Sequence, residues 1–231
     1  MQADRPTSND DAPSAAGVRV PLRTVAGVRV ADTSLVRRAV GIAQANMEPY
    51  LFNHVMRSWL FATLIAERDG IRLDAEVLAV SAVLHDIGLA EAFAGPLRFE
   101  VEGANLARKL AVESGVDARR AQLIWDSIAL NSTPSICLHK EPEAAVCLMG
   151  VGLDWGGWGY DAVAADARGS ILAEYPRLGM KRGFTRAICR LCEQRPETTY
   201  DNFARDFGTR FVPGYRAASM VDALLDAPFD E

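Results

Sequence analysis

One short run places two chemically active side chains at the end of an apolar segment. It is VLHDIG, residues 83–88, and the residues before it, 77–82, are Val, Leu and Ala with a single Ser. This composition is typical of a helix in a protein core. His85 and Asp86 do not suit a core, because a buried charge must be paired with another charge or bound to a metal ion. The run therefore predicts that these two side chains contact an opposite charge or a metal ion inside the protein.

A second histidine has a similar setting. The chain has three histidines, and His54 lies near the start of an amphipathic run, residues 53–61. We interpret the two runs as neighbouring helices that hold one metal ion. Adjacent residues on a helix do not share a face, so His85 and Asp86 are expected at a helix end, where both can turn towards one ion.

A distant carboxylate, Asp154, ends another predicted helix and completes a candidate ligand set with His54, His85 and Asp86. Imidazole nitrogens together with carboxylate oxygens suit Zn, Fe or Mn and suit Mg or Ca poorly. Four ligands leave a coordination position for water or substrate if the ion expands beyond four-coordinate. An open position is the mark of a catalytic site rather than a structural one.

The composition limits the classes of partner. The chain has 231 residues, of which 49% are hydrophobic and 24% charged, and its net charge of −5 gives no electrostatic footprint for nucleic acid or an anionic membrane. No apolar run reaches the roughly 18 residues of a membrane-spanning helix, and the N-terminus lacks a signal-peptide pattern. We predict a cytoplasmic protein with a small-molecule substrate and neither nucleic-acid nor membrane partners. The sequence leaves open whether the chain forms a homo-oligomer.

The four cysteines are consistent with the cytoplasm, where thiols stay reduced. Cys189 and Cys192 form a C-x-x-C pattern, but inside a helical pattern rather than after a strand. Two reduced thiols on a helix face are therefore favoured over a redox or zinc site.

The pattern along the chain predicts a single all-α domain. Residues 1–17, rich in Asp, Asn, Ser, Pro and Ala, predict a disordered tail, and residues 18–30 favour an extended segment. Helices are predicted from a Thr33 or Ser34 cap, over 50–70, from an Asp74 cap to 84, over 100–113, from an Asp117 cap to about 130, and over 142–154, 161–175, 181–194, 199–207 and 220–225. Residues 18–231 then form one helical bundle, with the metal-binding core at about 50–160 and additional C-terminal helices.

The candidate ligands also resemble a known signature. His54, the His85-Asp86 pair and Asp154 are similar to the H…HD…D pattern of the HD-domain superfamily, all-helical metal-dependent hydrolases, over about residues 53–154. A finer resemblance, carried by the NHxxR pattern at 53–57 and FEVxGA at 99–104, is to the branch that includes cyanamide hydratase. This resemblance implies an HD-domain fold with a single divalent ion, usually zinc, that activates water. Fe and Mn are the other candidates.

Two positions depart from the wider superfamily. Members with two metals carry further histidines, and Asn131 stands where one would be expected, while His139 follows Pro134 in a predicted loop and is a weak candidate. A two-metal oxygenase is therefore disfavoured. Many phosphohydrolase members place a Lys shortly after the HD-x-G turn, where this chain has Leu89.

These features favour a mononuclear metal-dependent hydratase or hydrolase, with cyanamide or another small nitrile-like compound as the substrate class. Asp86 would also orient the attacking water or accept its proton, and Arg57, Glu100 and Asn131 would contact substrate or relay protons. A narrow apolar pocket is expected, with walls from Trp59, Phe61, Phe93, Phe99 and Trp155. The alternative is an HD-type phosphohydrolase acting on a nucleotide or another phosphoester. A remoter alternative is a ligand-sensing HD module without turnover.

Overall fold

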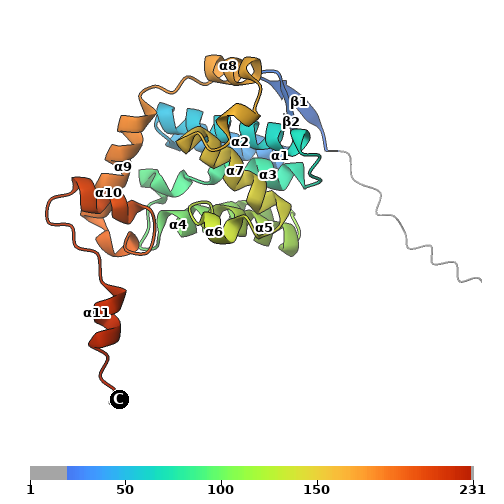
Figure 1. Ribbon diagram of the computed structural model, residues 1–231. Coiled ribbons are helices and arrows are strands. Elements are labelled where there is room, and N and C mark those ends of the chain that lie inside the picture. Colours follow the sequence, from blue (N-terminus) through green and yellow to red (C-terminus); the bar gives the residue numbers. More distant parts are fainter. Residues whose placement is uncertain (1–19, 230–231) are drawn as a thin grey trace, which may run out of the picture.

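The computed structural model describes residues 20–229, so the tail predicted over 1–17 lies outside the described residues. Its elements in chain order are β1 (Leu22–Val25), β2 (Val28–Ala31), α1 (Ser34–Asn46), α2 (Pro49–Arg68), α3 (Ala75–Leu84), η1 (Ile87–Leu89), η2 (Glu91–Phe93), α4 (Phe99–Glu113), α5 (Ala118–Ala129), α6 (Pro134–Cys137), α7 (Pro142–Gly156), η3 (Tyr160–Ala162), α8 (Ala165–Glu174), α9 (Met180–Gln194), η4 (Pro196–Thr198), α10 (Ala204–Phe211) and α11 (Met220–Leu225), where η marks a single 3-10 turn. Helices dominate the described chain (Figure 1), and the all-α prediction is confirmed.

The segment expected to be extended forms a small antiparallel hairpin. β1 pairs with β2 so that Val25 lies opposite Val28, and the turn residues between them, Ala26 and Gly27, both have positive φ. Positive φ at both central residues is typical of the tight turns that match the twist of a hairpin. β2 packs against α2 and α3, so the hairpin closes one side of the helical core.

Three helices begin at the caps predicted from the sequence. The Thr33 hydroxyl accepts a hydrogen bond from the Val36 amide, and the Asp74 and Asp117 carboxylates each accept from two amides of the first turn that follows. Such caps satisfy amides that have no partner inside the helix. Arg120 of α5 also binds Asp74 at 2.6 Å, which ties the start of α3 to α5.

The centre of the bundle consists of α2, α3 and α7. Every residue of 77–84 in α3 is buried, because α1, α2, α5 and α7 surround this helix. α2 and α7 make the most extensive contact between any two elements of the described chain. Their backbones approach closely at Gly150, where an added Cβ would collide with the Ser58 carbonyl oxygen and with Ala62. This crossing brings His54 of α2 next to Asp154 of α7.

The turn that follows the His-Asp pair is held against α4. The chain leaves α3 at His85 and passes through η1, where Gly88 lies so close to the first residue of α4 that a Cβ would overlap the Phe99 carbonyl group. Gly103 of α4 lies against Ile87 in the same contact. The glycines at 88 and 103 therefore let α4 pack closely against the turn at the end of α3.

The C-terminal helices add a second layer. α9 packs against α2 and α10, while α11 projects away from the body (Figure 1) with its apolar side chains in solvent, among them Met220 and Leu225. The helix predicted over 199–207 begins at Ala204, because the Thr198 and Thr199 hydroxyls donate back to main-chain carbonyls and close the turn η4 instead. Within residues 20–229, no helix combines the length and apolar character needed to cross a membrane.

Candidate metal centre

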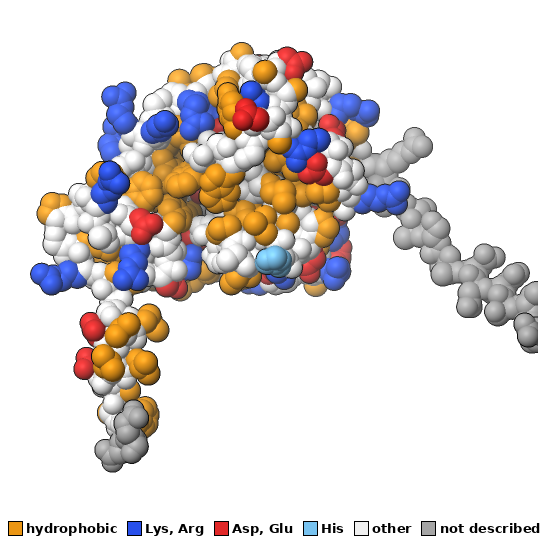
Figure 2. All heavy atoms as spheres, in the orientation of Figure 1, with side chains coloured by type: hydrophobic (Ala, Val, Ile, Leu, Met, Phe, Trp, Pro, Cys, Tyr) orange, Lys and Arg blue, Asp and Glu red, His pale blue; other side chains and the backbone are white. Residues whose placement is uncertain are grey.

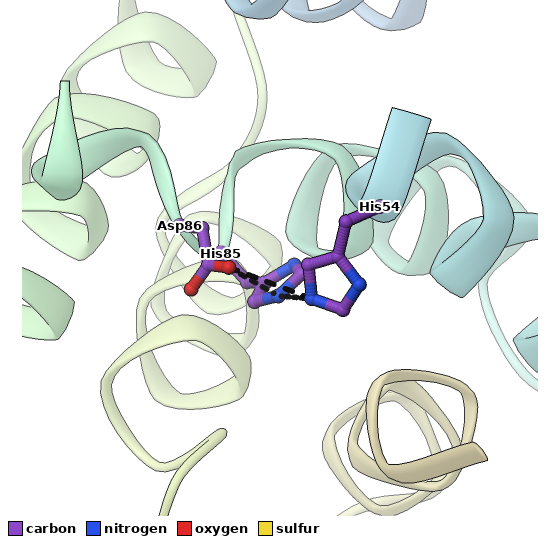
Figure 3. Close-up of side chains that lie close together, drawn as sticks. All are labelled: His54, His85 and Asp86. Atoms are coloured by element: carbon purple, nitrogen blue, oxygen red, sulfur yellow. Dashed lines mark hydrogen bonds and ion pairs between the residues drawn. The ribbon is translucent and has the colours of Figure 1, made fainter. Parts of the chain in front are cut away.

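Three side chains from two helices converge at one buried point (Figure 3). His54 extends from the N-terminal third of α2, while His85 and Asp86 lie where α3 passes into η1. The two Nε2 atoms are 3.2 Å apart, and Asp86 Oδ2 lies 3.5 Å from His54 Nε2 and 3.3 Å from His85 Nε2. All three side chains are buried. The helix end lets two successive side chains turn towards one point, as the sequence indicated.

The hydrogen bonds behind the two imidazoles determine which nitrogens face this point as acceptors. His85 Nδ1 is 2.8 Å from the Ala82 carbonyl oxygen, and His54 Nδ1 is 2.6 Å from Asp154 Oδ2. Both partners are acceptors, so each Nδ1 carries the proton and each neutral ring presents an Nε2 lone pair to the centre.

Asp86 Oδ2 is buried and has no hydrogen-bond partner within residues 20–229. Unless His85 takes up a second proton, two nitrogen lone pairs and a carboxylate oxygen therefore meet without a donor between them. Such an arrangement is unfavourable unless a cation lies among the three atoms, and they are the donor types that a divalent transition metal prefers. The residues present fit a metal ion.

The pKa values reflect the same convergence. Burial lowers the pKa of His54 below its usual range. Burial also opposes a charge on His85, but the Asp86 carboxylate and the Ala82 carbonyl outweigh it and raise the His85 pKa. Burial likewise disfavours the charged form of Asp86, yet His85 lowers its pKa overall. Asp86 is therefore an anion, which needs a proton on His85 or a metal cation beside it.

Asp154 occupies a different place from the one predicted. Its Oδ2 binds His54 Nδ1 and Arg57 Nη2, at 2.6 and 2.8 Å, and its Oδ1 binds Arg57 Nε and Arg177 Nη1, at 2.7 and 3.1 Å. Both oxygens are thus engaged on the far side of the His54 ring, away from Asp86. In this structure Asp154 orients His54 instead of joining the three converging atoms, an arrangement common behind metal-binding histidines.

Arg57 also differs from its predicted role as a substrate contact. The side chain is fully buried, and its Nη1 donates to the Tyr175 carbonyl while Nε and Nη2 hold Asp154. Arg57 lies one turn after His54 and contacts Asp154 on the Nδ1 side of the imidazole, not the Nε2 side that faces Asp86. Arg177 was missed by the sequence analysis, because it lies between α8 and α9, where no periodic pattern indicates which way a side chain points.

The Asp154 cluster makes a prediction about acid unfolding. Burial raises the Asp154 pKa, but the hydrogen bonds from His54 and Arg57 outweigh it and hold the pKa well below the ordinary value of 3.8. A carboxyl with a lower pKa in the folded state contributes stability above its unfolded pKa and loses it as the pH falls towards the folded pKa. Urea unfolding of chelator-treated protein should therefore show a stability loss below about pH 4 that Asp154→Asn reduces, while the part that comes from other carboxyls with a lowered pKa, such as Asp86, remains. The exposed Asp161→Asn should keep the wild-type acid profile, and equal profiles for all three proteins would contradict the assignment.

Glu100 and Asn131 were the remaining predicted catalytic residues. Glu100 is buried and its Oε1 accepts from Arg98 and from the Ser132 hydroxyl, so it links the start of α4 to the segment after α5. Asn131 does lie beside the converging atoms, but its amide nitrogen donates to the Ile128 and His85 carbonyls. Asn131 thus lines the cavity with its amide nitrogen held by the main chain, and its role as a substrate contact stays a prediction.

The three converging residues open into a cavity of about 290 Å³. Its walls are mostly apolar and aromatic: His54, His85, Asp86, Asn131, Ser132, Pro134, Leu148, Val151, Gly152, Trp155, Trp158, Phe184 and Phe203. Figure 2 shows hydrophobic side chains gathered along a hollow between the α9–α10 lobe and the rest of this face. Among the described residues, neither Lys nor Arg lines this cavity.

The predicted walls agree with the cavity at one residue, Trp155. Trp59, Phe61 and Phe99 are buried in the core instead, and Phe93 packs against the core from the outside. The missed walls are Phe184, in α9, and Phe203, just before α10, which follow His85 by about 100 and 120 residues in sequence. His139 is exposed and is not part of the cavity lining.

Comparison with known proteins agrees with this geometry. The sequence profile of the HD domain matches residues 51–145, which include His54, His85 and Asp86 but end before Asp154. A search of curated proteins gave no match. HD domains bind divalent metals and are typically metal-dependent hydrolases, and the His-His-Asp group described above is compatible with that chemistry. Residues 51–145 of this chain are therefore similar to the HD domain.

Proposed function

We propose that this protein is a metal-dependent hydratase or hydrolase that directs water to a neutral small molecule. The observation that carries the proposal is the make-up of the cavity. A His-His-Asp metal centre lies at its inner end, while none of the described lining residues is a Lys or Arg. A substrate without a net negative charge fits such walls.

Each residue of the centre has a separate role in the proposed reaction. A divalent ion, for which zinc is our candidate, would lower the pKa of a bound water to about 7 and polarise the bond under attack. His54 and His85 would hold the ion through Nε2, and Asp154 and the Ala82 carbonyl keep both rings in the required tautomer. Asp86 lines the cavity with Oδ2 beside both Nε2 atoms, so it is placed to ligate the ion and to accept a proton from the attacking water.

A phosphoester substrate is less well served. Its phosphoryl group carries a charge of about −1.5 to −2, which proteins usually neutralise with Arg or Lys. The nearby cations already have carboxylate partners: Arg57 and Arg177 bind Asp154, and Arg98 binds Glu100. A nitrile-like substrate needs no such cation, and the resemblance to the cyanamide hydratase branch supports the same choice. We favour addition of water to a C≡N bond.

This choice is tested by direct comparison of two substrate classes. Zinc-loaded protein should convert cyanamide or a small nitrile such as acetonitrile to its hydrated product faster than it releases phosphate from a nucleoside monophosphate or p-nitrophenyl phosphate. His85→Ala should lose both reactions, because one of three converging ligands is gone, while the exposed His139→Ala should keep them. Phosphate release without hydration would replace the proposal with the phosphohydrolase alternative. Absence of both reactions in metal-loaded protein would favour a sensing module.

A further inference from the structure

We infer that the substrate carries an apolar body of about ring size, held by the aromatic walls of the cavity while its polar head faces His54, His85 and Asp86. This inference rests on the proposed function and deepens it, because it adds the shape and polarity of the part of the molecule that does not react.

The first support is the size of the cavity. Its volume of about 290 Å³ is close to ten times the roughly 30 Å³ that a water molecule occupies in the liquid. Volumes of about 300 Å³ and above are usual for pockets that enclose organic ligands of several connected groups. A molecule as small as cyanamide would leave most of this apolar space unfilled.

The second support is the arrangement of aromatic rings. Phe184 of α9 and Phe203 before α10 stack with centroids 6.1 Å apart and an interplanar angle of 22°, and Trp155 of α7 meets both edge-on at 6.2 and 6.3 Å. Three rings from separate segments thus form one continuous wall. Rings held edge-to-face in this way offer a planar apolar group both faces and edges to pack against.

The third support is the exposure of two tryptophans at the cavity. Trp155 and Trp158 are 40% and 49% exposed, although both line an apolar cavity. Large aromatic surface left in water beside a concave site marks a place where a ligand buries it. Trp158 lies flat against α7, because Gly152 and Gly156 have no Cβ to hold its indole away.

Polarity divides the cavity into two ends. The metal ligands, Asn131 and Ser132 supply the imidazole, carboxylate, amide and hydroxyl groups of the described lining, and the remaining walls carry no charge and only the indole N–H groups of Trp155 and Trp158 as polar side-chain atoms. The polar and reactive head of the substrate therefore binds at the histidines, and its neutral apolar body lies along Trp155, Trp158 and Phe203.

The inference is tested by binding rather than by turnover. Zinc-loaded full-length protein is titrated by calorimetry with benzonitrile, cyclohexanecarbonitrile, acetonitrile and AMP, four probes that differ in body and charge, and binding is read from the heat released before any slower heat of hydration. We expect both ring-bearing nitriles to bind at least about tenfold tighter than acetonitrile, because their additional carbons leave water. We expect AMP to bind more weakly than benzonitrile. A negative heat-capacity change should accompany ring binding.

Gly152→Ala tests the place of binding. A Cβ at this position would overlap the Trp158 ring and push the indole from α7 into the space that lines the cavity. The ratio of benzonitrile to acetonitrile affinity should fall towards one. Gly41→Ala, an exposed glycine inside α1 whose added Cβ meets nothing, is the matched control and should keep the wild-type ratio. If Gly152→Ala fails to fold, Trp158→Ala, which truncates a half-exposed side chain, should lower the same ratio.

The outcomes separate this inference from the proposed function. A preference for ring-bearing nitriles that Gly152→Ala or Trp158→Ala removes supports the inference even if metal-loaded protein hydrates none of them. Equal affinities for acetonitrile and benzonitrile, or tighter binding of AMP, would overturn it even if cyanamide is hydrated. A ring preference that survives both variants would overturn the assigned location.

Discussion

Arg57→Ala is expected to lower the free energy of unfolding by roughly 3–5 kcal/mol, the usual effect of removing one partner of a buried ion pair. Arg57 is fully buried, and its guanidinium meets both oxygens of Asp154, at 2.7 and 2.8 Å. The substitution leaves Asp154 inside the protein with fewer donors and opens the space between α2 and the segment after α8. Urea unfolding of chelator-treated protein measures the loss.

A surface pair supplies the control. Arg68, at the end of the same helix, contacts Asp69 at 2.6 Å on the exposed surface. Arg68→Ala should leave the unfolding midpoint essentially unchanged, because water screens this pair. Similar midpoints for the two variants would show that Arg57 does not have the structural role assigned here. A double variant, Arg57→Met with Asp154→Leu, should recover part of the loss, because both buried charges are then removed and Arg177, the other cation on Asp154, is partly exposed to water.

Chelation is expected to lower the melting temperature of the wild-type protein, and His85→Ala should abolish this response. An ion that binds the folded state alone adds about 2.7 kcal/mol when its free concentration is 100 times its dissociation constant. His54 and His85 come from different helices, so the ion joins α2 to the end of α3. Metal analysis should find one ion per wild-type chain and none in His85→Ala.

His139→Ala is the matched control for that experiment, because it removes an exposed histidine away from the centre and should respond to chelator like the wild type. Identical wild-type melting temperatures with and without chelator would show that the ion is not coupled to the fold. Two ions per chain would contradict the single centre formed by the three converging residues.

The sequence predicted the helices well where local chemistry decides their ends. Thr33, Asp74 and Asp117 begin helices because their own side chains bind the first amides, and this signal lies within three residues. The meeting of His85 and Asp86 at a helix end followed from the same local reasoning. Helix η4 was missed, because threonine hydroxyls bond back to the main chain in a way that resembles a cap in sequence.

The surroundings of the centre could not be predicted in this way. Helical spacing shows that Arg57 shares a face with His54, but it does not show whether the arginine lies on the Nδ1 side or the Nε2 side of the imidazole ring. That choice depends on Asp154 and Arg177, which approach from other elements. The aromatic wall depends on how α9 returns over α2, and no local pattern at Phe184 or Phe203 encodes that path.

The close crossing of α2 and α7 at Gly150 has a consequence for anyone who wishes to transplant this centre into a designed bundle. The ligands alone would not be a sufficient specification, since the separation of the two helix axes sets whether the carboxylate at 154 reaches the imidazole at 54. A scaffold with ordinary leucine-filled spacing would hold the same side chains too far apart. A design must therefore keep Gly150 as well as the histidines, although this glycine is not among the residues that line the cavity.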